Sequence, residues 1–422
     1  MSHRAVCGID FGTSNSAIAV ADGGEPYLIK VENNSETIPT AIFFPEIKGS
    51  GPHFGRDAIS RFTGGEHGRL MRSLKRLMGL SIMNKPTRLN GQSIRLSDVV
   101  KIFVQNLKDR MDQVTTQDIN DVVMGRPVHF NDNDPEGDAL AQQTLEKIAL
   151  DVGFKNVEFQ YEPIAAAFAH EAKLSAEKLA LVVDIGGGTS DFTVMKLSKS
   201  YIHKADRRED ILANTGVRIG GNDFDKNLAL KSFMPLLGMG TTYGKKKLDV
   251  PTAHYFDLAT WSKINDLYTF KTINSIKTIL HEAHEKKKYE RLLEIVERQN
   301  GHLLLAKVEN AKIELTANLV YNQDIDFIEE DLYAQVSRAQ FEEAIDIEYK
   351  KIITCINDCL AKAGVKAADI SLVILTGGST EIPLLRDHVK RVFPTAEISE
   401  ENKLSSVALG LAYDGIRRFG RR

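Results

Sequence analysis

The stretch VVDIGGGTSDFTV, residues 182–194, contains the pattern that decides the fold. An apolar, β-branched run reaches Asp184 and is followed by three glycines, a threonine and a second aspartate. Consecutive glycines end a strand in a tight turn, and the backbone N–H groups of such a turn form a concavity that binds anions. A carboxylate there repels phosphate unless a cation lies between them, so Asp184 implies Mg²⁺. A plain β-hairpin with a surface aspartate is the alternative interpretation of this stretch alone.

A second copy of the pattern stands near the N-terminus, in VCGIDFGTSNSAIAV, residues 6–20. Asp10 corresponds to Asp184, and Thr13 with Ser14 corresponds to residues 189–190. The two aspartates are 174 residues apart in the chain, which is about the length of one domain. The repeat predicts two similar halves whose phosphate-binding hairpins face each other across a cleft, with both aspartates directed at one metal ion.

A third glycine turn follows in LVILTGGSTEIPLL, residues 372–385. A strand of the buried type leads into Gly377, Gly378 and Ser379, and Pro383 is placed for the first turn of a helix. A glycine turn that opens a helix suits the sugar or base end of a nucleotide. The three turns together predict a nucleotide cleft.

From length and composition we expect an ordinary protein with two domains or one large domain of two lobes. The 422 residues exceed what one hydrophobic core organises, and 42% of them are hydrophobic and 26% charged. A net charge of −3 gives no reason to expect nucleic acid or an anionic membrane as a partner. The chain shows no secretion signal, no apolar run near the ~20 residues of a membrane span, and three cysteines that cannot form a disulfide framework. We expect a cytoplasmic location.

At the three glycine turns the chain resembles the actin-like ATPase superfamily and, within it, the nucleotide-binding domain of Hsp70 chaperones. Five more motifs follow the order of that family: SLKRLMG (73–79), RPVHFND (126–132), YEPIAAAFAHE (161–171), IGGNDFDKNLA (219–229) and ENAKIELT (309–316). The sequences of these motifs are most similar to those of the short YegD-type Hsp70 homologues of bacteria, which look like the nucleotide-binding domain alone. By this likeness we expect no peptide-binding domain.

The resemblance implies an α/β protein with the actin-like ATPase fold. Two lobes, each a copy of a ribonuclease H-like core with an inserted subdomain, would surround the nucleotide cleft. The expected boundaries are lobe I at 1–170 (core 1–25 and 97–170, insert 26–96) and lobe II at 171–422 (core 171–220 and 307–422, insert 221–306).

The resemblance also implies the ligands, ATP or ADP with Mg²⁺, and the residues that hold them. Asp10 and Asp184 would hold the metal, and Pro127 matches a proline linked to signalling between the lobes. The residues implied for catalysis are Asp10, Thr13, Glu162, Asp184, Thr189 and Asp191. The residues implied for nucleotide binding are Gly12, Thr13, Ser14, Asn15, Gly186, Gly187, Gly188, Thr189, Gly221, Asn222, Glu309, Lys312, Thr316, Gly377, Gly378 and Ser379.

The chain departs from the family pattern at the catalytic lysine. The family places that lysine at the end of a G-x-x-A-K stretch, whereas FGRDAIS puts Ile59 at its register. Arg56 or Arg61 lies close in sequence, but a guanidinium on another stem is not equivalent to an ammonium. Losing a cation beside the transferred phosphate lowers the rate more than the binding, so we expect slow hydrolysis.

Base recognition departs from the pattern as well. Hsp70 proteins hold adenine between two arginines, and Ile313 and Glu381 stand at those positions here. Asn222 replaces a glutamate of the family pattern. We therefore expect weaker or less adenine-selective binding, with the phosphates contributing most of the affinity.

The function expected from the sequence is an Hsp70-like, Mg²⁺-dependent ATP-binding protein. It would hydrolyse ATP slowly, close its lobes on nucleotide and signal to a protein partner or client. The alternatives are a non-hydrolysing nucleotide sensor or scaffold, a filament-forming actin-like protein, and a sugar kinase or polyphosphate phosphatase of the same superfamily.

Overall fold

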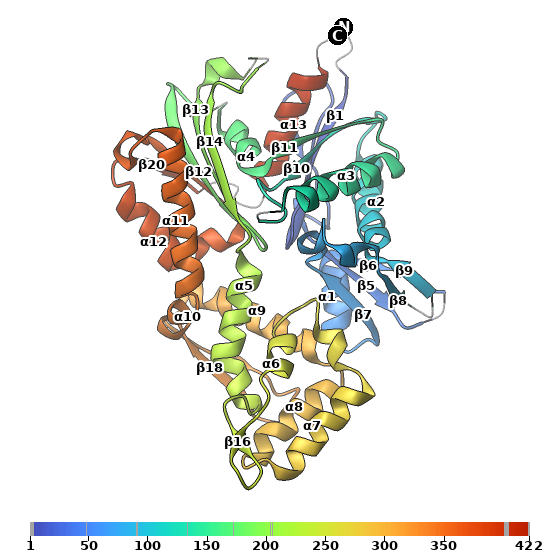
Figure 1. The fold of residues 1–422 in the computed structure, drawn as a ribbon. Helices are drawn as coiled ribbons and strands as arrows, with labels where there is room; N and C mark the ends of the chain where they lie inside the picture. Colours follow the sequence, from blue (N-terminus) through green and yellow to red (C-terminus); the bar gives the residue numbers. More distant parts are fainter. Residues whose placement is uncertain are drawn as a thin grey trace. The chain divides into compact units, whose positions relative to one another are not determined.

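The computed structural model describes residues 4–420 except 48, 90–91, 133, 172, 203, 205 and 401–404. The chain forms two compact units (Figure 1). Unit 1 consists of Met1–Gly221 with Lys351–Arg422, and unit 2 of Asn222–Lys350. The boundaries of lobes and inserts inferred from the sequence stay predictions.

The first large sheet of unit 1 is built around the N-terminal hairpin. Its strand order is β11-β10-β1-β2-β3, and β4 also pairs with β2. β1 and β2 are antiparallel, while β10 and β11 continue the sheet parallel to β1. The strands are β1 (Val6–Phe11), β2 (Asn15–Ala21), β3 (Tyr27–Leu28), β4 (Thr37–Pro39), β10 (Asp121–Arg126) and β11 (Asn156–Tyr161).

The second large sheet of unit 1 repeats this arrangement. Its order is β14-β13-β12-β19-β20, in which β12, β13 and β14 are antiparallel and β19 and β20 run parallel to β12. The strands are β12 (Lys178–Ile185), β13 (Ser190–Leu197), β14 (Ile211–Val217), β19 (Leu372–Thr376) and β20 (Glu397–Ser399).

The helices between the strands follow the same repeat. One helix precedes the first parallel strand, a second joins the two parallel strands, and a third follows them. In the first half these are α2 (Leu96–Val114), α3 (Pro135–Asp151) and α4 (Glu162–Glu171), and in the second half α11 (Asp346–Ala363), α12 (Pro383–Val392) and α13 (Ser406–Phe419). The topology therefore confirms a duplicated α/β core, as the two aspartate–glycine hairpins predicted.

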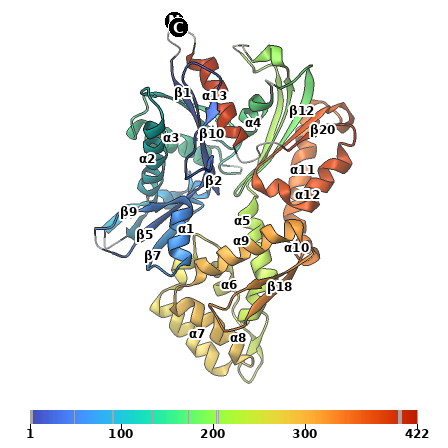
Figure 2. The same ribbon diagram turned by 180° about the vertical axis from the view of Figure 1, so that it is seen from behind.

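Successive side chains along a strand point to opposite faces of the sheet and therefore pack in two different layers. Cys7 and Ile9 of β1 join a core with α2 and α3, whereas Gly8 between them lies against the backbone of α13. In the second sheet, Val182 packs with α4 and α13, and Val183 faces α11 and α12. Both views show α4 and α13 lying between the two sheets (Figures 1 and 2).

The remaining elements of unit 1 lie mainly between β4 and α2. A three-stranded sheet of order β6-β5-β7 packs against α1, and it is followed by two 3₁₀ turns and a hairpin. These elements are β5 (Ala41–Pro45), β6 (His53–Phe54), α1 (Gly55–Thr63), β7 (Gly68–Arg72), η1 (Leu74–Leu77), η2 (Ser81–Asn84), β8 (Pro86–Leu89) and β9 (Gln92–Arg95). The 3₁₀ turns η3 (Lys199–Tyr201), η7 (Ala367–Asp369) and η8 (Gly378–Glu381) belong to the second half.

Unit 2 is mainly helical, with two hairpins. Its core includes the buried side chains of Tyr255, Tyr289 and Leu304. Its main elements are α5 (Gly221–Leu228), β15 (Thr242–Tyr243), β16 (Leu248–Asp249), α6 (Ala253–Leu258), α7 (Phe270–Glu282), α8 (Lys286–Glu297), α9 (Gly301–Ala317), β17 (Val320–Asp324), β18 (Tyr333–Ser337) and α10 (Arg338–Ala344). Across the described part of the chain, no helix combines the length and the apolar character needed to cross a bilayer.

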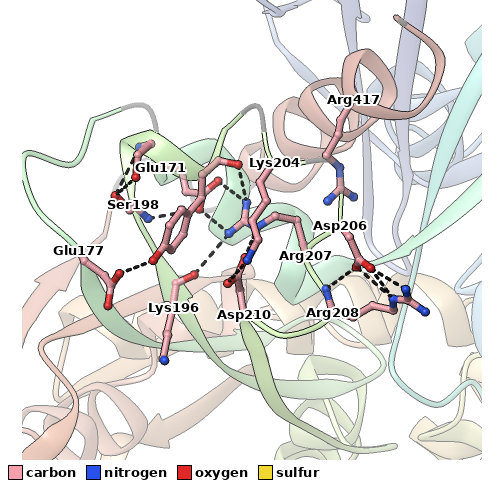
Figure 3. A network of polar contacts seen from close by, with 12 residues as sticks. Glu171, Glu177, Lys196, Ser198, Lys204, Asp206, Arg207, Arg208, Asp210 and Arg417 are labelled. Atoms are coloured by element: carbon pink, nitrogen blue, oxygen red, sulfur yellow. Dashed lines mark hydrogen bonds and ion pairs between the residues drawn. The ribbon is translucent and has the colours of Figure 1, made fainter.

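A buried arginine ties the end of α4 to the loop before β14 (Figure 3). Arg207 is 3% exposed and donates to both carboxylate oxygens of Glu171, at 2.7 and 2.6 Å, and to Asp210 at 2.7 Å. Lys204 donates to the other oxygen of Asp210 at 2.8 Å. The guanidinium also lies over the ring of Phe168, 5.1 Å from its centroid. Two buried carboxylates thus have two cations, so this network is balanced in charge.

We expect Gly410→Ala to destabilise the protein, although alanine is normally the better helix residue by about 1 kcal/mol. A Cβ at Gly410 of α13 would overlap the backbone carbonyl of Ala165 in α4, and that carbonyl moves only if the whole helix moves. Overpacking of this kind costs about 1–3 kcal/mol. Urea denaturation followed by circular dichroism measures the change. The matched control is Gly24→Ala, where a Cβ meets no atom within 4 Å. An unchanged or higher midpoint for Gly410→Ala would contradict this packing.

Arg207→Met is expected to lower the free energy of unfolding by about 3–5 kcal/mol, because it leaves the carboxylates of Glu171 and Asp210 buried without their main partner. The control is Arg208→Met, since Arg208 is exposed and its pair with Asp206 lies in solvent. Urea midpoints should fall for Arg207→Met and stay constant for Arg208→Met. Equal midpoints for the two variants would show that the buried network contributes nothing to stability.

Candidate functional site

The opening sequence motif forms the hairpin β12–β13. Asp184 near the end of β12 pairs across the hairpin with Asp191, and the turn is closed by a hydrogen bond from Gly186 N to Thr189 O at 3.0 Å. Asp184 is 7% and Asp191 1% exposed. Asp191 accepts the backbone N–H of Val128 at 2.7 Å, a residue that follows β10 in the other half of the core. This bond joins the second hairpin to the first sheet.

The N-terminal motif forms the corresponding hairpin β1–β2. Asp10 pairs with Ala17, and the turn runs through Gly12, Thr13 and Ser14. A Cβ at Gly12 would overlap the carbonyl oxygen of Asn15, so the turn requires glycine there. Thr13 is 8% exposed.

The two turns lie directly against each other. A Cβ at Gly187 would overlap Ser14 Oγ, and a Cβ at Gly188 would lie 2.7 Å from Thr13 Oγ1. Glycine at both positions therefore permits a contact between halves that are far apart in sequence. The hydroxyls and backbone amides of both turns are gathered in one place.

The third turn meets the second hairpin. Gly377 has a φ of 79°, and a Cβ there would overlap the carbonyl of Ile185. Ser379 Oγ donates to Gly186 O at 3.1 Å, and Gly221 N donates to the same carbonyl oxygen at 3.0 Å. Gly378 begins η8, and α12 starts at Pro383 as the sequence predicted. Gly377, Ser379 and Gly221 thus surround the turn that follows Asp184.

A lysine that sequence analysis did not single out lies in the same cluster. Lys75 of η1 is 6% exposed, and its amine contacts Oε1 of Glu162, the first residue of α4, which is 8% exposed. Gly125 of β10 leaves the space that the Glu162 side chain fills, since a Cβ there would lie 3.2 Å from Glu162 Cγ. The motif SLKRLMG contains Lys75, but only the positive charge of Lys75 could have indicated from the sequence that it belongs to the site.

The acidic side chains of the cluster are hard to ionise together. Burial and the nearby Glu162 raise the pKa of Asp10 to about 7, while Lys75 lowers it in part. Burial and Glu162 also raise the pKa of Asp191 to about 7. The pKa of Asp184 is raised well above its ordinary value by burial, and by Glu162, Asp191 and Asp10. Like charges at close range in a site that excludes water have this effect.

The pKa of Lys75 is raised as well, which for an amine favours the charged form. Burial alone lowers the pKa of its amine, but the carboxylates of Glu162 and Asp10 outweigh burial and raise it. The amine is therefore held as an ammonium among Asp10, Glu162, Asp184 and Asp191. Unlike the balanced network of Arg207, this cluster sets four carboxylates around Lys75.

The remaining predicted residues belong to unit 2. Glu309, Lys312 and Thr316 share one face of α9, and all three are half-buried. Lys312 Nζ forms an ion pair with Asp225 Oδ1 at 2.8 Å, and Thr316 Oγ1 donates to Ile313 O at 2.7 Å. Asn222 lies in the first turn of α5.

The residues of unit 1 fit a magnesium nucleotide. The raised pKa values of Asp10 and Asp184 mark a place where a cation would relieve repulsion. The glycine turns offer backbone amides beside those carboxylates, which is the donor set that phosphates need. Within the ranges that the structure describes, no group of three or more His, Cys, Asp or Glu side chains is placed to hold a metal ion. Mg²⁺ commonly keeps several waters and uses only one or two carboxylates, as this pair offers.

Comparison with known protein families finds a match over most of the chain. The family described as Hsp70 protein matches residues 6–88, 83–234 and 269–416, which is most of the chain. The matched segments contain all three glycine turns, Lys75, Glu162 and α9. The family has the actin-like ATPase fold, which agrees with the duplicated core, and its members generally bind ATP or ADP with Mg²⁺ and interact with client proteins. The chain belongs to the Hsp70 protein family.

Proposed function

We propose that this chain is a Mg²⁺-dependent ATPase that turns over slowly and closes its lobes on nucleotide to signal to a protein partner or client. The observation that carries the proposal is the contact between two glycine turns, each with an aspartate at its strand end. The likeness to YegD-type proteins and a cytoplasmic location are part of the same proposal. The support for slow turnover is Ile59 at the register of the family lysine, because a cation that reaches the phosphate from another element is not placed as that lysine is.

The phosphates are assigned to the two turns. The backbone N–H groups of Gly12–Asn15 and Gly186–Thr189 would bind their oxygens, and the hydroxyls of Thr13 and Thr189 would add donors. Asp10 and Asp184 would hold Mg²⁺, chiefly through waters, and when bound the ion neutralises charge on the phosphates. In unit 1 the ribose and base are assigned to Gly221, Gly377, Gly378 and Ser379. For Asn222, Glu309, Lys312 and Thr316 of unit 2 the same role is proposed from the family resemblance alone.

Glu162 and Asp191 are assigned to the attacking water. Both carboxylates are almost fully buried, and burial together with the nearby Glu162 raises the pKa of Asp191, so Asp191 accepts a proton readily. The water oxygen forms a bond to the γ-phosphorus, and the bond to the β–γ bridging oxygen breaks with its electron pair leaving on ADP. The water proton passes to the carboxylate and then to phosphate or solvent.

The bond between Asp191 and Val128 suggests how the site signals. Val128 follows Pro127, so a shift of Asp191 on nucleotide binding is passed to the end of β10 in the other half. The layer of α4 and α13 is shared by both sheets and is the natural place for their relative movement.

Asp184→Asn tests the binding site. We expect calorimetric affinity for ATP with Mg²⁺ to fall about tenfold or more, and added EDTA to have no further effect, because a charge-assisted contact to the hydrated ion is lost. The variant should fold, since a neutral side chain relieves the repulsion that raises the pKa of Asp184. The control is Asp118→Asn, at an exposed aspartate.

Unchanged Mg²⁺-dependent affinity in Asp184→Asn would contradict the assignment of the metal. Phosphate release by the wild type is measured alongside. Tight binding without release would favour the alternative of a nucleotide sensor over an ATPase.

Ile313→Arg tests base recognition. Ile313 is 55% exposed on α9, and an arginine there restores one cationic plane for stacking on adenine. We expect affinity for ATP to rise about threefold to fivefold, with a smaller rise for inorganic triphosphate. The control is Ile347→Arg, since Ile347 is 65% exposed in the same unit. Equal gains for ATP and triphosphate would indicate simple charge attraction and reject the stacking role.

A further inference from the structure

The two arginines nearest the register of Ile59 are engaged elsewhere in the structure. Arg56 donates to Glu32 and to the carbonyl of Thr37, each at 2.7 Å. Arg61 pairs with Asp57 at 3.1 Å and with Glu66 at 2.9 Å. The guanidinium groups of α1 therefore do not replace the lysine that the family motif places at residue 59.

Lys75 stands in the cluster instead, on a different element. Its amine contacts Glu162, and the carboxylates of Asp10 and Asp191 are close enough to raise its pKa. The side chain reaches this position from a 3₁₀ turn that begins after Ser73, whose φ of 58° is left-handed. This conformation is unfavourable for a residue with a Cβ, and such strain persists where the surroundings hold a group in a required place.

The turn that carries Lys75 also lies against the second glycine turn. A Cβ at Gly188 would be 2.9 Å from Cγ of Arg76, the neighbour of Lys75. The same Cβ at Gly188 would lie 2.7 Å from the hydroxyl oxygen of Thr13 in the first turn. Lys75 and both glycine turns thus meet at one point of unit 1.

A purely structural ion pair is the simpler explanation of Lys75, but it does not account for the surroundings. A buried Lys–Glu pair needs no further carboxylates, and the desolvation of each added charge makes the cluster less stable. The Arg207 network shows how this chain builds a structural pair, with each buried carboxylate hydrogen-bonded to a cation. At Lys75 the carboxylates of Asp10, Asp184 and Asp191 outnumber the single amine, which already contacts Glu162, as in a site that also receives a divalent cation.

We propose that Lys75 is the cation that contacts the terminal phosphate of ATP in this protein, in place of a lysine at residue 59. The assignment rests on the proposed function. During hydrolysis Lys75 stays protonated and offsets the negative charge of the transferred phosphoryl group, while the water proton goes to Glu162 or Asp191. Glu162 orients the amine through their contact.

Lys75→Met is the test, with calorimetry of ATP and ADP and a phosphate-release assay on the same samples, all with Mg²⁺. We expect the affinity for ATP to fall about tenfold and the affinity for ADP to fall less than about twofold, because only ATP carries a γ-phosphate. Phosphate release should fall about a hundredfold. The control is Lys85→Met, at an exposed lysine ten residues further along, with both affinities and the rate unchanged.

Three more variants make the test independent of folding and of the alignment that places Ile59 at the position of the family lysine. If Lys75→Met does not fold because Glu162 is left without its partner, Lys75→Met with Glu162→Gln removes the unpaired carboxylate, and the ratio of ATP to ADP affinity remains the readout. Lys75→Arg should recover part of the ATP affinity but not the rate, since a guanidinium differs in shape and stem. Ile59→Lys should not accelerate the wild type if Lys75 already supplies the cation.

The possible failures are distinct. A wild type that releases phosphate, together with a Lys75 variant of unchanged affinity ratio and rate, would overturn the role of Lys75 and leave the ATPase proposal standing. Acceleration by Ile59→Lys would also overturn it, because the site would then lack a cation. A wild type that binds neither nucleotide would overturn the proposed function and the role of Lys75 together.

Discussion

Repulsion among buried carboxylates is the constraint around which the core of this protein is arranged. Two unit charges 4 Å apart interact by about 4 kcal/mol at an effective dielectric constant of 20, so several acidic groups in one place are a large cost. Asp10, Asp184 and Asp191 carry this cost as raised pKa values. A chain keeps such a cluster only where a cation completes it. Lys75 supplies one positive charge, and the Mg²⁺ ion that accompanies a nucleotide at the glycine turns would supply two more.

The fold brings the acidic groups together by repeating one unit. Each copy places an aspartate near the end of the first strand of a hairpin, and the two hairpins meet where glycines of the second turn lie against Thr13 and Ser14 of the first. Glu162 comes from a third direction, at the start of α4. Because α4 packs against α13 at Gly410 with no space for a Cβ, the position of Glu162 is tied to the layer shared by both sheets.

The contrast between the two buried polar clusters gives the core its functional asymmetry. Around Arg207 the carboxylates of Glu171 and Asp210 are fully hydrogen-bonded, so the network is stable without a ligand and holds the end of α4 in place. Around Lys75 the acidic groups outnumber the amine, so its stability depends on what binds. Under the proposed function, one end of α4 is anchored and the other meets the ligand, an arrangement suited to passing the state of the site to the helix layer.

Local patterns in the sequence were sufficient for the hairpins, the third turn and the duplicated α/β fold. Glycine runs after β-branched segments have few alternatives, and a strand pairs with its neighbour through a short turn without distant contacts. The family match then agreed with the fold and with ATP as ligand. The roles of individual residues remain proposals, because a motif names residue types and not their geometry.

Only the tertiary structure decided which cation lies in the cluster. Counting along the motif pointed to Ile59 and left Arg56 and Arg61 as substitutes, yet both arginines pair with other acids and Lys75 reaches Glu162 across 87 residues of sequence. The bond between Asp191 and Val128 was likewise invisible, since its partners belong to different halves. The sequence by itself determined the turns, because backbone conformation depends on neighbouring residues. The electrostatic partners required the fold, because charges interact through space and are indifferent to the order of residues along the chain.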